Sequence, residues 1–146
     1  MHGLAASCAS LAASTIPDTL VHGDLHPGNI MVLHGEARLF DWSDGAVSHP
    51  FVDLTCFLRR AETPPARRRM ADAYLALWAA GYGMARVERA LDDALVVGAL
   101  YQVQTYMALV PAMDLRDRWQ FEDGPWRWLR FAIRPLEIGP RSRPGD

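Results

Sequence analysis

The pattern of apolar and polar positions changes about a third of the way along the chain. Before that point, three short apolar runs rich in β-forming residues, 19–22, 29–33 and 37–41, predict strands. A short connection that contains Gly35 joins the last two runs, which predicts a β-hairpin. The first run leads into a polar loop with the sequence HGDLHPGN.

Helical spacing of apolar residues dominates the remainder of the chain. We expect one helix before the strands, at about 3–14, and a loop, WSDGAVSHP, after Asp41. Proline and glycine then separate four helical patterns, which are expected at about 50–61, 64–80, 84–112 and 126–136. Because no alternating βαβ order is present, the pattern predicts an α+β, mostly helical domain with a small β-hairpin assembly.

The third of these helices contains a long uncharged segment. Residues 94–113 carry no charge, and a run of that length could span a bilayer. However, Gln102, Gln104 and Thr105 interrupt it, and no basic cluster flanks it. We therefore expect a buried helix and no membrane partner. Residues 1–18 have no Lys or Arg before their apolar stretch, so a secretory signal is not indicated either.

Composition narrows the class of protein further. A chain of 146 residues, 50% of them hydrophobic, is sufficient for one globular domain with a core. The formal net charge of -2 gives no electrostatic reason for nucleic-acid binding. Cys8 and Cys56 form neither a CxxC pair nor a disulfide framework, which suits a reducing compartment, and we expect a cytoplasmic protein. All basic residues are arginine, and the sequence contains no lysine.

The hairpin brings candidate metal ligands together. If Gly35 is its midpoint, Asn29 and Asp41 oppose each other at the open end, where Cα atoms are about 4.5–5.5 Å apart. Amide and carboxylate oxygens suit Mg²⁺, which usually keeps waters and phosphates as its other ligands. Asp24, five residues before Asn29, would then stand beside the ion, where a group that accepts a hydroxyl proton is needed.

Three motifs carry a resemblance to a known family. HGDLHPGN fits the HxDxxxxN spacing of kinase catalytic loops, LFDWSDG follows it, and HPFVDL comes next. Between about residues 16 and 58 the chain resembles the aminoglycoside phosphotransferase and choline kinase family, which has a protein-kinase-like fold. By that resemblance Asp24 is the catalytic base, with His22 supporting the catalytic loop, and Asn29 and Asp41 are the Mg²⁺ ligands.

The resemblance also implies supporting residues and a reaction. Asp53 is similar to the family's acidic residue that steadies the loop from the following helix, and His26 supports the site. The implied reaction transfers the γ-phosphoryl group of ATP, with Mg²⁺, to the hydroxyl of a small-molecule acceptor. Trp42 and Ser43 stand where protein kinases have Phe and Gly, which favours a small-molecule kinase.

The parts that hold nucleotide phosphates are not found in the sequence. Neither a glycine-rich loop nor a strand lysine is present, and only twenty-three residues precede Asp24. We therefore expect residues 1–138 to be the carboxy-terminal catalytic lobe, 139–146 a disordered tail, and the nucleotide-binding amino-terminal lobe to be absent. Such a lobe is expected to be inactive alone and to self-associate through exposed apolar surface.

Two other functions stay open at this point. The chain could be a catalytically inactive remnant or a binding domain. Alternatively, His22, Asp24, His26 and Asp41 could bind a transition metal in a hydrolase, because HxDxH offers imidazole and carboxylate donors.

Two charged clusters also have alternative interpretations. The arginine cluster is either a solvated face or a site for an anionic ligand, and the acidic cluster could line a pocket for a cationic substrate, as the resemblance to aminoglycoside kinases suggests. The clusters are Arg59, Arg60, Arg67, Arg68 and Arg69, and Asp114, Asp117, Glu122 and Asp123.

Overall fold

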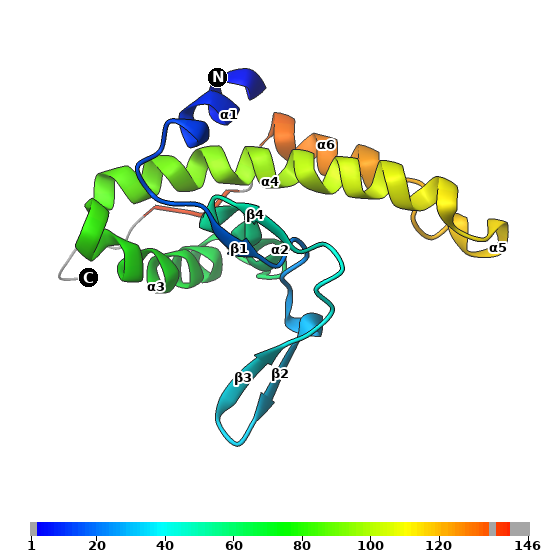
Figure 1. Cartoon of the computed structure of the whole chain (residues 1–146), viewed down its shortest axis with the longest axis horizontal. Coiled ribbons are helices and arrows are strands. Elements are labelled where there is room, and N and C mark those ends of the chain that lie inside the picture. Colours follow the sequence, from blue (N-terminus) through cyan, green and yellow to red (C-terminus); the bar gives the residue numbers. More distant parts are fainter. Residues whose placement is uncertain (1–2, 135–136, 141–146) are drawn as a thin grey trace.

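The computed structural model describes residues 3–134 and 137–140. It is mostly helical with two short antiparallel strand pairs, which confirms the predicted α+β class (Figure 1). The chain order is α1 (Leu4–Ala12), β1 (Thr19–Val21), η1 (Pro27–Asn29), β2 (Ile30–Leu33), β3 (Glu36–Leu39), β4 (Ala46–Ser48), η2 (Pro50–Asp53), α2 (Leu54–Arg59), α3 (Pro64–Tyr82), α4 (Met84–Ala112), α5 (Leu115–Arg118) and α6 (Gly124–Ile133).

Helix α4 is the central element of the fold. It contacts α1, α2, α3, η2 and α6, and Figure 1 shows it running the length of the molecule. Its buried residues include Leu91, Ala94 and Ala99. One core cluster joins its first half to η2, α2 and α3, with Phe51 and Leu75 fully buried. A second, smaller cluster joins its second half to α6.

A glycine in α4 permits its close approach to the segment after β4. A Cβ atom on Gly98 would lie 2.2 Å from Thr55 Oγ1 and 2.8 Å from the Val52 carbonyl oxygen. One turn earlier, the Thr55 hydroxyl donates a hydrogen bond to the Ala94 carbonyl at 3.4 Å. The helix therefore lies directly against η2 and α2, which helps to position the site described below.

The first half of the membrane-like segment of α4 contributes to the core. By length and composition α4 could cross a bilayer. Nine of its residues between positions 87 and 102 are nevertheless buried against other elements, and this bears out the expectation of a buried helix for the first half of the segment. Exposed apolar residues on the second half include Met107 and Leu109.

The first strand, β1, pairs with a strand that the sequence did not predict. Residues 46–48, within the expected loop WSDGAVSHP, form β4, which pairs antiparallel with β1. The loop prediction is wrong there because a three-residue strand has too little periodicity to detect locally, and its pairing partner is distant in sequence.

The predicted hairpin is present, with a different register. Ile30 pairs with Leu39, and the Phe40 amide donates to the Asn29 carbonyl at 3.2 Å. Asn29 therefore faces Phe40 rather than Asp41. The reason is a two-residue turn, His34–Gly35, in which both residues have positive φ, 52° and 84°. Such turns match the twist of the strands, whereas a midpoint at Gly35 needs a three-residue connection.

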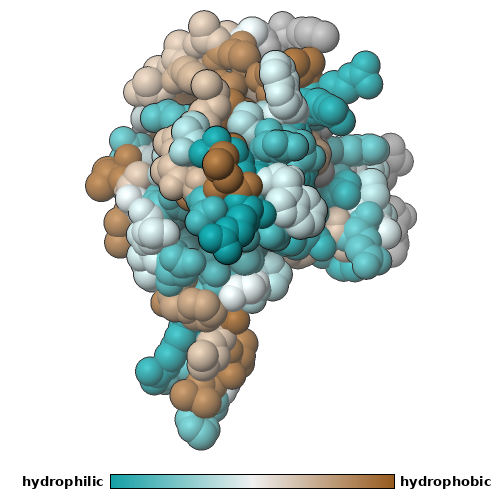
Figure 2. Space-filling model, turned by 90° about the vertical axis from the view of Figure 1, so that its right-hand side faces the viewer, coloured by the Kyte–Doolittle hydropathy of each residue, from teal (hydrophilic) through white to brown (hydrophobic). Residues whose placement is uncertain are grey.

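The hairpin stands apart from the helical body (Figure 1). Apolar residues in its strands are exposed, with Met31 at 52% and Val32 at 70% of their full accessibility. Figure 2 shows apolar residues along this protruding arm. The expected exposed apolar surface is therefore found on the hairpin.

Helix boundaries follow the predictions closely, with local differences. The helix expected at 50–61 is a 3₁₀ turn, η2, followed by α2, and an extra one-turn helix, α5, follows α4. Gly83, with φ 79°, ends α3. The end of the last predicted helix and most of the predicted disordered tail, residues 141–146, fall outside the described residues.

Candidate functional site

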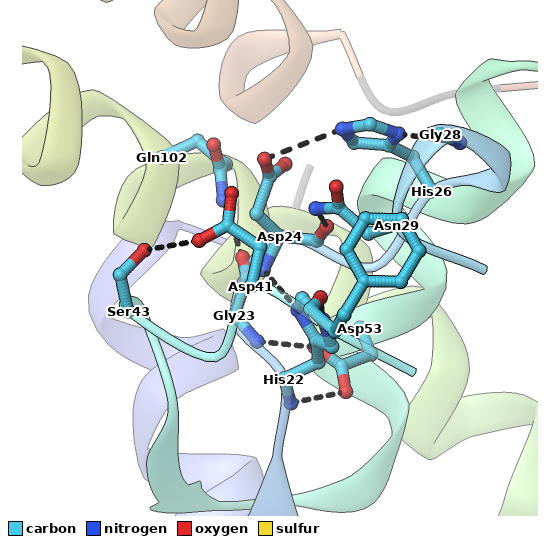
Figure 3. Close-up of polar contacts among 11 residues, drawn as sticks. His22, Gly23, Asp24, His26, Gly28, Asn29, Asp41, Ser43, Asp53 and Gln102 are labelled. Atoms are coloured by element: carbon cyan, nitrogen blue, oxygen red, sulfur yellow. Dashed lines mark hydrogen bonds and ion pairs between the residues drawn. The ribbon is translucent and has the colours of Figure 1, made fainter. Parts of the chain in front are cut away.

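The loop between β1 and η1 is fixed by one carboxylate. Asp53, in η2, accepts hydrogen bonds from the His22 amide (Oδ2, 2.7 Å) and the Gly23 amide (Oδ1, 2.8 Å) (Figure 3). Two bonds from an ionised acceptor hold the backbone in one orientation more firmly than neutral bonds would. Asp53 therefore lies where the resemblance places the loop-steadying acid.

Gly23 is required by this geometry. Its φ of 83° lies in the left-handed region, and a Cβ there would lie 2.0 Å from the Asp44 carbonyl oxygen. Only glycine accepts both conditions without strain. The close approach brings the loop that contains Asp24 against the loop that contains Asp41 and Asp44.

His22 is a buried support for both loops. It is 1% exposed, its Nε2 lies 2.9 Å from the Phe40 carbonyl oxygen, and its Nδ1 is 3.4 Å from the Asp24 amide. Because Nδ1 accepts from an amide, the proton of the neutral ring lies on Nε2, which donates to Phe40. The Trp42 ring packs on it with ring centroids 4.8 Å apart. Both nitrogens are therefore used in holding the backbone.

Asn29 is oriented by the same loop. Its Nδ2 donates to the Asp24 carbonyl at 3.0 Å, and the residue is 8% exposed. With the amide nitrogen used in this way, Oδ1 is the atom available as an acceptor or metal ligand. This hydrogen bond joins two residues that are five positions apart and closes the segment between them into a compact loop.

Two side chains contact the Asp24 carboxylate. His26 Nε2 lies 3.4 Å from Asp24 Oδ2, while His26 Nδ1 accepts from the Gly28 amide at 3.0 Å, which leaves the ring proton on Nε2. Burial, together with the charge of Asp24 and a hydrogen bond to it, raises the pKa of the Cys56 thiol. Cys56 therefore stays protonated beside Asp24.

Asp41 lies just beyond the hairpin ladder in a left-handed conformation with φ 62°. Its Oδ1 accepts from the Ser43 hydroxyl at 3.0 Å. Figure 3 shows the carboxylates of Asp24 and Asp41 and the amide of Asn29 on the same side of the two loops. The hairpin register differs from the prediction, yet Asp41 still lies beside the loop that contains Asp24.

Comparison with protein families identifies this arrangement. The sequence model of the Phosphotransferase enzyme family (APH) matches residues 2–91, more than half of the chain and all of the loops just described. The chain belongs to the phosphotransferase enzyme family. This confirms the resemblance to aminoglycoside phosphotransferases and choline kinases. Comparison with curated proteins and with solved structures finds no match.

The loops of the candidate site accumulate negative charge. Burial, and then the charges of Asp24 and Asp41, raise the pKa of Asp44, with His22 acting in the opposite direction. Three carboxylates thus lie within electrostatic reach of one another. Carboxylate and amide oxygens with excess negative charge fit a hard divalent cation such as Mg²⁺, and Asn29 and Asp41 are the residues that would hold it.

The geometry does not favour the transition-metal alternative. His22 has both ring nitrogens engaged with backbone, and His26 uses Nδ1 on Gly28. Within residues 3–134 and 137–140, no group of three or more His, Cys, Asp and Glu side chains is placed to hold a metal ion. A site that uses the amide oxygen of Asn29 is of a different kind, because asparagine is not among those four residue types.

Sequence reasoning missed several residues that surround the candidate site. Gln102 Nε2 donates to the Gly23 carbonyl at 2.6 Å, and the Tyr101 hydroxyl donates to the Asp44 carbonyl at 2.7 Å. Cys56 contacts Asp24 from α2. The available signal for Gln102 is its position as a polar residue inside an apolar helical run.

The charged clusters have structural partners. Arg68 pairs with Asp72 and Glu88, and Arg67 donates to the Ala61 and Glu137 carbonyls. In the acidic cluster, Asp114 caps α5 and Asp123 pairs with Arg127. These contacts favour a structural role for the residues involved over the predicted ligand sites.

Arg59 has a different environment from the other arginines of its cluster. Its guanidinium lies 4.5 Å from the centroid of the Trp128 ring and 5.6 Å from that of Phe131. Such cation–π contacts tie α2 to α6. Burial lowers the pKa of Arg59.

Proposed function

We propose that the chain is the catalytic lobe of an ATP- and Mg²⁺-dependent phosphotransferase that acts on a hydroxyl of a small molecule. The observation that carries the proposal is the loop geometry: Asp53 fixes the backbone before Asp24, and Asn29 and Asp41 present oxygen atoms beside it. Membership of the phosphotransferase family supports the reaction class.

In this proposal Asp24 orients the acceptor. Its carboxylate accepts the hydroxyl hydrogen, the hydroxyl oxygen forms a bond to the γ-phosphorus, and the bond from that phosphorus to the ADP oxygen breaks. The hydroxyl proton passes to Asp24 and then to solvent. Asn29 and Asp41 would hold Mg²⁺, which when bound neutralises charge on the transferring phosphate. His26 and Cys56, which contact Asp24, restrict its rotamers.

We also propose that groups outside the described loops hold the nucleotide phosphates, because the sequence has no lysine. A nucleotide-binding lobe that covers the exposed apolar hairpin would meet this requirement. The chain alone is then expected to transfer no appreciable phosphate and to self-associate with rising concentration in sedimentation experiments. A chain that remains monomeric at all concentrations would contradict the proposal that the apolar hairpin is normally covered by another lobe.

The experiment measures cation binding and phosphoryl transfer separately. Mn²⁺, used as a probe for Mg²⁺, is titrated into the chain and its free fraction is followed by electron paramagnetic resonance. We expect Asp41→Asn and Asn29→Ala to weaken Mn²⁺ binding, and Asp117→Asn, an exposed acid on α5, to leave it unchanged. Equal binding by all four proteins would contradict the proposed metal ligands.

Transfer from ATP to aminoglycosides, choline and amino alcohols is then assayed with the same proteins and with Asp24→Asn. Robust turnover that falls by about 10²–10⁴ in Asp24→Asn would establish the base and overturn the expectation of inactivity. The alternative, an inactive remnant or binding domain, is favoured by the missing lysine. Absence of both Mn²⁺ binding and transfer would select it.

A further inference from the structure

The catalytic loop and the Asp41 loop are both attached to one turn of α4. Tyr101 and Gln102 are neighbours in that helix, so their side chains leave it about 100° apart at nearly the same height. The Tyr101 hydroxyl reaches the Asp44 carbonyl at 2.7 Å, and Gln102 Nε2 reaches the Gly23 carbonyl at 2.6 Å. These bonds join residues 57 and 79 positions apart.

The Gln102 bond fixes the peptide that precedes the base. That peptide has two polar groups: the Gly23 carbonyl, which accepts from Gln102, and the Asp24 amide, which lies 3.4 Å from His22 Nδ1. With both groups held, the peptide plane cannot rotate, and the direction in which the Asp24 side chain leaves the backbone is set. Figure 3 shows Gln102 beside Asp24 and Asp41. Gln102 is 3% exposed, so water does not compete freely for its bond.

The Tyr101 bond holds the turn of residues 42–45, which directly follows Asp41. A non-glycine residue with positive φ is strained, and it persists only when its surroundings restrain it. The turn is closed by the Gly45 amide, which donates to the Trp42 carbonyl at 2.9 Å, and its far side is tied to the body through Tyr101. Without the hydroxyl, the turn can relax and Asp41 can rotate away.

The helix that carries both residues is itself rigid at this level. Gly98 lies one turn earlier and brings α4 against Thr55 and Val52, which flank the segment that contains Asp53. The anchors of the two loops, Asp53, Tyr101 and Gln102, therefore belong to one packed unit.

We propose that Tyr101 and Gln102 are positioning residues of the phosphotransfer site, which set the separation of Asp24 from the metal ligand Asp41. This rests on the proposed function. The two residues act through the backbone, and loss of either bond is expected to loosen a loop while leaving the fold intact.

The test uses the full chain with Tyr101→Phe and Gln102→Leu. The matched controls are Tyr106→Phe and Gln104→Leu, which lie on the same helix, whereas the hydrogen bonds from α4 to the two loops described above come from Tyr101 and Gln102. Mn²⁺ affinity is measured by electron paramagnetic resonance, amide hydrogen exchange is followed for residues 22–25 and 41–45, and the thermal unfolding midpoint is recorded. We expect each test variant to bind Mn²⁺ about 10- to 100-fold more weakly and to exchange faster in its own loop.

The outcomes separate the two proposals. Unchanged Mn²⁺ affinity in both test variants, with wild-type binding intact, would overturn the positioning role. Unchanged hydrogen exchange would overturn it as well. If the wild-type chain binds no Mn²⁺, the proposed metal site fails, and the exchange data still decide whether Tyr101 and Gln102 hold the loops. Tyr101→Phe removes a single oxygen atom, so it keeps the test decisive even if Gln102→Leu does not fold.

Discussion

The helical body and the β2–β3 hairpin differ in what holds them. In the body, α4 is surrounded by other helices, and residues such as Leu91 and Leu75 are almost completely buried. In the hairpin, Met31, Val32 and Leu39 are all at least 41% exposed, and the arm contacts little besides η1. The body thus stabilises the fold by burial, whereas the hairpin depends on its own ladder and turn.

The proposed site lies across this boundary. The backbone before Asp24 is held through Gly23, whose amide donates to Asp53 and whose carbonyl accepts from Gln102, both in the body, whereas Asn29 and Asp41 lie at the base of the hairpin. The difference teaches that the proposed base, Asp24, is placed by packing over long sequence separations. The proposed metal ligands, Asn29 and Asp41, are placed largely by local structure at the base of the hairpin.

The largest expected effect tests burial directly. Leu91→Ala removes a side chain that is 2% exposed in the centre of the core, and it should lower the free energy of unfolding by about 2–5 kcal/mol. Val32→Ala in the hairpin should change it by less than about 0.5 kcal/mol. Chemical denaturation of both variants provides the measurement. Similar losses would mean that the hairpin is part of the cooperative core.

A second pair of variants tests the contact between α4 and η2. Gly98→Ala places a methyl group against the Val52 carbonyl and Thr55, and overpacking of this kind costs about 1–3 kcal/mol. Gly81→Ala is the control, because it lies in α3 with open space around it and should raise stability by about 0.5–1 kcal/mol. A stabilised Gly98→Ala protein would show that α4 can move away from η2 without loss.

The base of the hairpin allows a test of backbone strain. Asp41 has φ 62°, so Asp41→Ala should be less stable than Asp41→Gly by about 1 kcal/mol, and both should lose Mn²⁺ affinity. His34, with φ 52° in the turn, is the matched position: its Ala and Gly variants should show the same gap with Mn²⁺ binding intact. Equal stability of Asp41→Ala and Asp41→Gly would indicate that the backbone at Asp41 is not strained.

The smallest effect is a pH dependence confined to the body. His49 is buried, accepts from the Phe51 amide, and burial lowers its pKa below the usual 6.5. The unfolded state therefore binds more protons near that pH, so stability is fully present above about pH 6.5 and is lost as the pH falls below it.

His49→Asn keeps an acceptor for the Phe51 amide and removes the titration. Thermal unfolding between pH 5 and 8 should be less pH-dependent in this variant than in the wild-type chain. His34→Asn, at an exposed position of the hairpin, should follow the wild type. A pH profile that His49→Asn leaves unaltered would contradict the assignment.

Local sequence was sufficient for the helices, the hairpin and most of the candidate site. The spacing of His22, Asp24, Asn29 and Asp41 within one loop and one hairpin, followed by Asp53, is a pattern of near neighbours. Residues that are close in sequence are also close in space, so the sequence alone predicts the residues of the candidate catalytic loop. One local error, the hairpin register, arises because the sequence is compatible with both a two-residue and a three-residue turn.

Tertiary structure decided the contacts that join distant segments. The pairing of β1 with β4, the bond from Gln102 to Gly23 and the contact of Cys56 with Asp24 each depend on how α4 and α2 pack against the loops. In a sequence, a glutamine that bonds to a distant loop looks the same as one that faces solvent. A cysteine that only packs in the core likewise looks the same as one that lies beside a carboxylate. Only the three-dimensional arrangement brings their partners within bonding distance, because the interactions act through space rather than along the chain.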